Sequence, residues 1–275
     1  MPVHFHNFDA VLIDLDGTLL RHEQPLPGAG EFAAAVARAS AASAMRYAVL
    51  TNSTAGPNRI ARRMASAGLG IDPGHVYTAA AAACDHVVHT LGRPDGRPAR
   101  VFNLATPDVY ELLDGRAAFV GDGADAAGAC DAVIVGNPTN EHATPDRQRR
   151  ALALLRGGAA LVATSADRVF PSGRGIEFGS GALAAMLAYA AGVRPQFCGK
   201  PQAAFFLELC RRLNARPERC LLVGDNLEAD VVGAKALGMR TVLMLTGVTS
   251  ERELAAAPPA MRPDAVARDL RELLI

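Results

Sequence analysis

The chain has 275 residues, half of them apolar, and its 28 lysines and arginines balance its 28 aspartates and glutamates. A chain of this length can bury one large or two ordinary hydrophobic cores. A formal net charge of zero excludes the strongly basic surface of nucleic-acid and anionic-membrane binders, so we expect neither partner. The N-terminus lacks the regions of a secretory signal, and the longest apolar stretch, near residues 181–193, is too short to span a bilayer. We therefore expect a cytoplasmic protein.

The first predicted element is a buried strand within residues 10–20, which runs directly into two carboxylates and a glycine. Alternate side chains of a strand share a face, so Asp14 and Asp16 are expected to point together beyond its end. Gly17 allows a sharp turn and a close approach to a ligand. Two such close carboxylates favour a hard cation such as Mg²⁺ between them, with room left for phosphate oxygens. The alternative is an Asx turn or a helix cap.

A helix over 31–44, a strand over 46–51 and a helix over 58–67 follow. This alternation of strands and helices predicts parallel pairing through right-handed crossovers. Thr51 and Asn52 end the second strand, where they either cap the next turn or contact a ligand.

A second series of strands and helices begins near residue 78. Its predicted strands cover 100–104, 117–120, 132–135 and 160–164. Its predicted helices cover 79–91, 107–113, 145–156 and 181–191, with a loop over 167–180. We expect residues 78–194 to form an inserted domain, and residues 1–77 and 195–275 to form the core domain.

The core resumes with residues 196–199, a helix over 202–213 and a buried strand over 220–223 that leads to Asp225. A helix from Asp230, a strand over 241–245 and a short terminal strand and helix complete the chain. Lys200, one of only two lysines, lies between a glycine and a proline, and its alternative is an ordinary solvated lysine. The predicted fold class is α/β: a Rossmann-like, doubly wound parallel sheet with an inserted α/β cap domain.

Four segments of the chain, in order, resemble the four motifs of the haloacid dehalogenase superfamily. They are DLDGTL from residue 14, VLTNS from residue 49, GKP from residue 199 and LVGDNLEAD from residue 222. An α/β cap between the second and third motifs resembles class IIA, the NagD-like and 4-nitrophenylphosphatase-like phosphatases. The strings TSAD (164–167), GSGA (179–182) and LTGV (245–248) extend this likeness over nearly the whole chain. Ser53 and Ser165 depart from it, because the subgroup often has asparagine there, and this leaves secondary phosphate and cap contacts open.

The resemblance implies hydrolysis of a phosphate monoester through a covalent aspartyl-phosphate. It assigns the nucleophile to Asp14 and the general acid and base to Asp16, a residue that the dehalogenase branch generally lacks. It brings the charge of Lys200 to the phosphate and to Asp14.

The resemblance also implies the binding residues. Mg²⁺ would be held by Asp14, the backbone carbonyl of Asp16 and Asp225. Asp230 would start a helix and reach either the water shell of the metal or Lys200. Phosphate-binding groups would come from Gly17, Thr51, Asn52 and Lys200.

The function expected from this resemblance is a Mg²⁺-dependent phosphatase acting on a small phosphorylated metabolite. Two alternatives stay open: a phosphotransferase or phosphomutase with the same nucleophile, and a catalytically silent protein that binds phosphometabolites. The subgroup acts on sugar and glycerol phosphates, phosphoglycolate, nucleoside monophosphates and pyridoxal phosphate, and the residues do not choose among them. Relatives often pair through their caps, which implies a homodimer.

Overall fold

The computed structural model describes residues 3–92, 96–122, 130–172 and 175–274. Two compact units divide the chain: the first comprises residues 1–51, 57–77 and 200–275, and the second comprises residues 52–56 and 78–199. The second unit reaches residue 199, beyond the expected end at 194, because β12 (Pro195–Phe197) pairs with β9 (Ala160–Ala163) of that unit. Within the described ranges, no helix has both the length and the apolar character needed to cross a bilayer.

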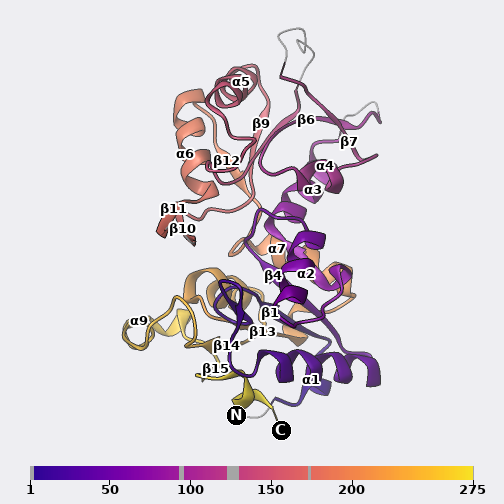
Figure 1. The fold of residues 1–275 in the computed structure, drawn as a ribbon, viewed down its shortest axis with the longest axis vertical. Helices are drawn as coiled ribbons and strands as arrows, with labels where there is room; N and C mark the ends of the chain where they lie inside the picture. Colours follow the sequence, from indigo (N-terminus) through magenta and orange to yellow (C-terminus); the bar gives the residue numbers. More distant parts are fainter. Residues whose placement is uncertain (1–2, 93–95, 123–129, 173–174, 275) are drawn as a thin grey trace. The chain divides into compact units, whose positions relative to one another are not determined.

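A six-stranded sheet forms the centre of the first unit, in the order β15-β14-β13-β1-β4-β5 (Figure 1). Its strands are β1 (Ala10–Asp14), β4 (Arg46–Thr51), β5 (Val76–Thr78), β13 (Cys220–Gly224), β14 (Arg240–Met244) and β15 (Ala265–Ala267). The chain first builds outward from β1 through β4 and β5, and later builds in the opposite direction from β13. This reversal between β1 and β13 is the switch point at which doubly wound folds bind ligands, beyond the carboxyl ends of the strands.

Parallel register brings the ends of β1 and β13 to the same edge of the sheet. Leu12 lies opposite both Ala48 and Leu222, and Ile13 lies opposite Val223. All five residues of β1 are buried, which explains its apolar run without alternation. The predicted α/β fold class is therefore confirmed.

Helices and short turns cover this sheet. The helices are α1 (Ala29–Ala42), α2 (Pro57–Ser66), α7 (Ala203–Leu213), α8 (Gly233–Lys235) and α9 (Glu251–Ala256). The 3₁₀ turns are η1 (Phe5–Asn7), η2 (Pro73–His75), η3 (Pro217–Arg219), η5 (Pro259–Met261) and η6 (Leu270–Leu273). A small hairpin, β2 (Leu20–Arg21) and β3 (Gln24–Pro25), follows β1.

The helix expected from Asp230 has a different form. Residues Leu227–Val232 form a π-helical segment, η4, which continues into the short α8. The side-chain oxygen of Asn226 accepts hydrogen bonds from the backbone N–H groups of Glu228 and Ala229. The backbone N–H of Asn226 donates to Asp230 Oδ2 at 3.1 Å. Such wide turns are uncommon and occur often at functional sites.

The second unit contains a parallel five-stranded sheet in the order β12-β9-β8-β6-β7. Its remaining strands are β6 (Ala99–Leu104), β7 (Ala117–Phe119) and β8 (Ala132–Val135), and its helices are α3 (Ala79–Thr90), α4 (Asp108–Leu112), α5 (Pro145–Arg156) and α6 (Ser180–Ala191). Its core includes Phe102, Val133, Leu155 and Leu183. The segment expected as a loop contains an antiparallel hairpin, β10 (Val169–Ser172) and β11 (Gly175–Phe178).

Candidate active site

A buried ion-pair cluster lies at the end of β1. Asp14 is the last residue of that strand, and its Oδ1 accepts a hydrogen bond from Lys200 Nζ at 2.6 Å. Lys200 Nζ also donates to Asp230 Oδ1 at 2.7 Å. All three side chains are at most 5 % exposed, so the lysine charge is shared by two carboxylates that water does not solvate.

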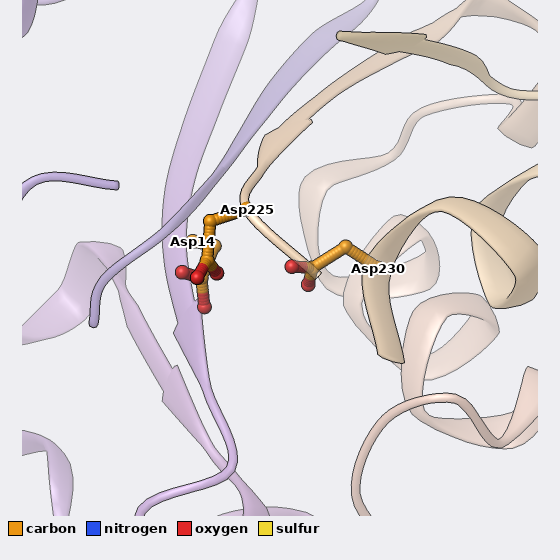
Figure 2. Close-up of side chains that lie close together, drawn as sticks. All are labelled: Asp14, Asp225 and Asp230. Atoms are coloured by element: carbon orange, nitrogen blue, oxygen red, sulfur yellow. The ribbon is translucent and has the colours of Figure 1, made fainter. Parts of the chain in front are cut away.

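Asp225 adds a third carboxylate from the neighbouring strand, since it directly follows β13. Ligand atoms of Asp14, Asp225 and Asp230 lie within 4.8 Å of one another. Figure 2 shows the carboxylate of Asp230 directed toward those of Asp14 and Asp225. The family resemblance implied that these residues share one site, and the structure brings their carboxylates together.

Because Gly17 and Gly247 have no side chains, the Asp225 carboxylate has room to lie against them. Its Oδ2 accepts the N–H of Val248 at 2.7 Å. A Cβ atom added at Gly17 would lie 2.3 Å from this Oδ2, and one at Gly247 would lie 1.7 Å from it. Both distances are far below van der Waals contact, so neither position accepts a side chain while Asp225 keeps its place.

We therefore expect Gly247→Ala to lower the free energy of unfolding by about 3 kcal/mol, as overpacking of a filled site does. Because Asp225 must move, the variant should also lose the thermal stabilisation by Mg²⁺. Gly30→Ala is the matched control, since an added Cβ there meets nothing within 4 Å. Denaturant unfolding and thermal shifts with and without Mg²⁺ measure both effects. A Gly247 variant that matches the control would contradict this account of Asp225.

The cluster has three carboxylates and one ammonium group, and this imbalance shifts their titration. Burial, together with Asp230 and Asp225, raises the pKa of Asp14 well above its ordinary value in spite of Lys200. Burial and Asp230 raise the pKa of Asp225 to about 6. Burial opposes the charge of Lys200, but Asp14 and Asp230 outweigh it and raise the pKa of the lysine.

These residues fit a hard divalent cation. Within the described residues, Asp14 Oδ2 is buried and has no hydrogen-bond partner. An orphaned carboxylate oxygen beside two further carboxylates supplies oxygen ligands and excess negative charge, which Mg²⁺ prefers.

The pKa of Asp225 gives a test by pH. In metal-free protein the folded state keeps the Asp225 proton to about pH 6, whereas the unfolded chain releases it near pH 4. The folded state binds more protons in that window, so the contribution of Asp225 to stability falls as the pH rises from about 4 to about 6. Mg²⁺ needs the ionised carboxylate, so its thermal stabilisation should be larger at pH 7 than at pH 5. An equal Mg²⁺ shift at both pH values would contradict this, and Asp225→Asn should show no shift at either.

The side chain of Asp16 does not join the cluster. Half of it is exposed, and its Oδ1 accepts a hydrogen bond from Arg63 Nη2 at 2.7 Å. The strand pattern predicted that this carboxylate would lie beside that of Asp14 with a cation between them, and this is wrong, because β1 ends at Asp14 and the Asp16 carboxylate pairs with Arg63 instead. The family resemblance implies a metal contact only through the backbone carbonyl of Asp16. Nothing in the sequence pattern indicated Arg63, which lies 47 residues away in the chain.

The three expected phosphate-binding residues of the strand ends have different surroundings. Gly17 adopts a left-handed φ of 92°, and its N–H donates to the carbonyl of Leu20. Thr51 is buried at the end of β4. Asn52 belongs to the second unit, where its Nδ2 donates to both carboxylate oxygens of Asp167, at 3.3 and 3.1 Å. After Arg63, Asp167 is the second partner of a site residue that the sequence pattern did not indicate, although Asp167 is the last residue of the TSAD string (164–167).

Comparison with known proteins decides the family. The haloacid dehalogenase-like hydrolase model matches residues 11–116, and the HAD-hydrolase-like model matches residues 197–273. The D-glycerol 3-phosphate phosphatase of Mycobacterium tuberculosis is 33 % identical over 273 residues, which cover 96 % of this chain and 70 % of that protein. The chain belongs to the haloacid dehalogenase-like hydrolases. The family resemblance carried by the four motifs is thus confirmed, and the chain is an enzyme of this family.

Within the haloacid dehalogenase-like hydrolases the chain is NagD-like. The ribonucleotide monophosphatase NagD of Escherichia coli is 30 % identical over 250 residues, which cover 90 % of this chain and 92 % of that protein. The fold agrees as well. The crystal structure of a glycerol phosphate phosphatase from M. tuberculosis in complex with magnesium has a TM-score of 0.86 and 29 % identity, covering 99 % of this chain and 79 % of that one.

Proposed function

We infer that this hydrolase is a Mg²⁺-dependent phosphatase that releases inorganic phosphate from small phosphate monoesters. The observation that carries this is the buried carboxylate of Asp14, held by Lys200 beside Asp225 and Asp230 at the switch point of the sheet. The magnesium complex of one relative and the phosphatase names of others support it.

We assign the covalent step to Asp14. One of its carboxylate oxygens attacks the phosphorus atom, an acyl phosphate bond forms, and the bond from phosphorus to the leaving oxygen breaks. Asp16 gives its proton to that leaving oxygen, so that an alcohol departs. Asp16 then takes a proton from water, which attacks phosphorus, so that inorganic phosphate leaves and the Asp14 carboxylate is restored.

The surrounding residues supply charge and position. Mg²⁺ would be held by Asp14, Asp225 and the backbone carbonyl of Asp16, and when bound it offsets the charge of the carboxylates and of the phosphate. Lys200 keeps Asp14 oriented and adds a positive charge, while Asp230 keeps Lys200 in place. Gly17, Thr51, Asn52 and Lys200 are proposed to contact the phosphate oxygens.

A phosphate-release assay tests this function. Purified protein is given 4-nitrophenyl phosphate, then glycerol 3-phosphate, nucleoside monophosphates and other phosphorylated metabolites, each with Mg²⁺ or with EDTA. We expect release of inorganic phosphate that requires Mg²⁺. Transfer of the phosphoryl group to an acceptor other than water would instead indicate a phosphotransferase, and binding without turnover would indicate a silent protein.

We also propose that the enzyme forms a homodimer through the second unit. Large apolar side chains are exposed there, with Tyr189 on α6 94 % exposed and Ile176 on β11 80 % exposed. Contacts between copies would remove this surface from water. Light scattering should give twice the chain mass, and Ile176→Asp with Tyr189→Asp should give the monomer. A monomeric wild-type protein at micromolar concentration would reject the dimer.

A cytoplasmic location is proposed on the basis of the thiols. All five cysteines are free thiols, and Cys210 Sγ lies 3.7 Å from Cys220 Sγ, joined to it by a hydrogen bond and not by a disulfide. Unpaired thiols are typical of reducing compartments. Fractionation of the native cells would test it, and recovery outside the cytoplasm would reject it.

A further inference from the structure

Arg63 connects Asp16 to the β2–β3 hairpin. Its Nη2 donates to Asp16 Oδ1 at 2.7 Å and to the carbonyl oxygen of His22 at 2.5 Å, and its Nε donates to Glu23 Oε1 at 3.3 Å. All four residues belong to the first unit.

The guanidinium group is presented from a fixed element. Helix α2 buries Ile60 and Met64, and only 23 % of the Arg63 side chain is exposed. Asp16, in contrast, is half exposed, so packing alone leaves its carboxylate free to choose among rotamers. A planar guanidinium can hold a carboxylate and a carbonyl at once, which a lysine does less well.

The contact with Arg63 uses only one carboxylate oxygen of Asp16, so Asp16 can still exchange a proton through the other. Arg63 holds Oδ1, so proton exchange with the substrate is left to Oδ2. General acid catalysis requires a carboxyl oxygen within one hydrogen bond of the leaving oxygen, and a displacement of about 1 Å can lower a rate about 100-fold. A partner that fixes the orientation of the Asp16 side chain would therefore raise the rate of proton transfer to the leaving group.

We propose that Arg63 is a positioning residue that holds the Asp16 carboxylate in the orientation from which it protonates the leaving alcohol. The inference rests on the proposed phosphatase function. In this role Arg63 does not contact the substrate. Its effect on the reaction also differs from that of a residue that only stabilises the β2–β3 hairpin.

Leaving groups of different basicity test this role. The alcohol of an alkyl phosphate such as glycerol 3-phosphate must be protonated as it departs, whereas 4-nitrophenolate leaves as an anion. We expect Arg63→Met to lower kcat/KM about 100-fold for the alkyl phosphate and about threefold or less for 4-nitrophenyl phosphate. kcat/KM covers only the steps up to departure of the leaving group, so water activation by Asp16 does not affect this comparison.

Three further variants separate the contacts. Arg63→Lys keeps one charged donor and should recover about tenfold of the alkyl phosphate activity. Arg62→Met, a neighbouring exposed arginine, should leave both substrates unchanged. Glu23→Gln weakens only the contact to the hairpin and should leave the ratio of the two substrates unchanged.

Equal losses of Arg63→Met on both substrates, or no loss on the alkyl phosphate, would overturn the inference. If Arg63→Met does not fold, the ratio for Arg63→Lys decides, because a loss confined to the alkyl phosphate supports positioning and equal losses reject it. A wild-type protein that hydrolyses neither substrate would reject the proposed function itself, so the two failures are distinguishable.

Discussion

Lys200→Met is expected to lower the free energy of unfolding by about 3 to 5 kcal/mol and to abolish phosphate release, because it leaves two buried carboxylates without their cation. Lys200 Nζ lies 2.6 Å from Asp14 and 2.7 Å from Asp230, and all three groups are removed from water. Denaturant unfolding at neutral pH without metal measures the stability, and phosphate release with Mg²⁺ measures the activity.

The pH dependence of this variant has a definite sign. The pKa of Asp14 is already raised well above its ordinary value with Lys200 present, and loss of the lysine raises it further. Protonation then relieves the repulsion with Asp230, so the stability difference from the wild type should be smaller at pH 5 than at pH 8.

Lys235→Met is the matched control for Lys200. Lys235 is the only other lysine, and its Nζ lies 3.6 Å from Asp264 in a partly exposed pair. Such pairs contribute about 1 kcal/mol or less, so this variant should stay near the wild type in stability and activity. If the Lys200 variant is as stable as this control, the buried cluster does not hold its charges as the structure describes.

The part of the site that could be predicted from the sequence is the part fixed by strand ends. Asp14 and Asp225 each follow an uninterrupted apolar run, which indicates a strand buried on both faces. Parallel strands bring their carboxyl ends to one edge, so the meeting of these residues follows from the strand pattern. Lys200 was found through its motif and not through periodicity.

What could not be predicted depends on side-chain partners across the fold. The contact of Asp16 with Arg63 joins a loop to a helix. The sequence of an amphipathic helix shows which of its residues are charged, but it does not show which of these charges form ion pairs with residues elsewhere in the fold. The antiparallel strands β10 and β11 were not predicted because a polar, glycine-containing stretch resembles a loop, although the alternation of Ile176 and Phe178 is a weak signal of a strand.

Asp14→Asn is expected to lower phosphate release about 10⁴-fold or more while the metal-free protein keeps its stability. Asparagine has nearly the same shape but supplies no anionic oxygen for attack on phosphorus. Because the pKa of Asp14 is raised in the folded state, its ionised form lowers stability at neutral pH, and the neutral amide removes this effect while Asp230 still pairs with Lys200. The free energy of unfolding at pH 8 should therefore equal or exceed that of the wild type.

Comparison with Asp16→Asn separates the nucleophile from the proton donor. Asp14→Asn should lose activity on glycerol 3-phosphate and on 4-nitrophenyl phosphate alike, because both reactions need the acyl phosphate. Asp16→Asn should lose more in kcat/KM on the alkyl phosphate, whose leaving group needs a proton. Thermal stabilisation by Mg²⁺ should also fall in Asp14→Asn, since among the described residues its Oδ2 is a buried carboxylate oxygen without a hydrogen-bond partner. An Asp14 variant that keeps activity within tenfold of the wild type would show that another group attacks phosphorus.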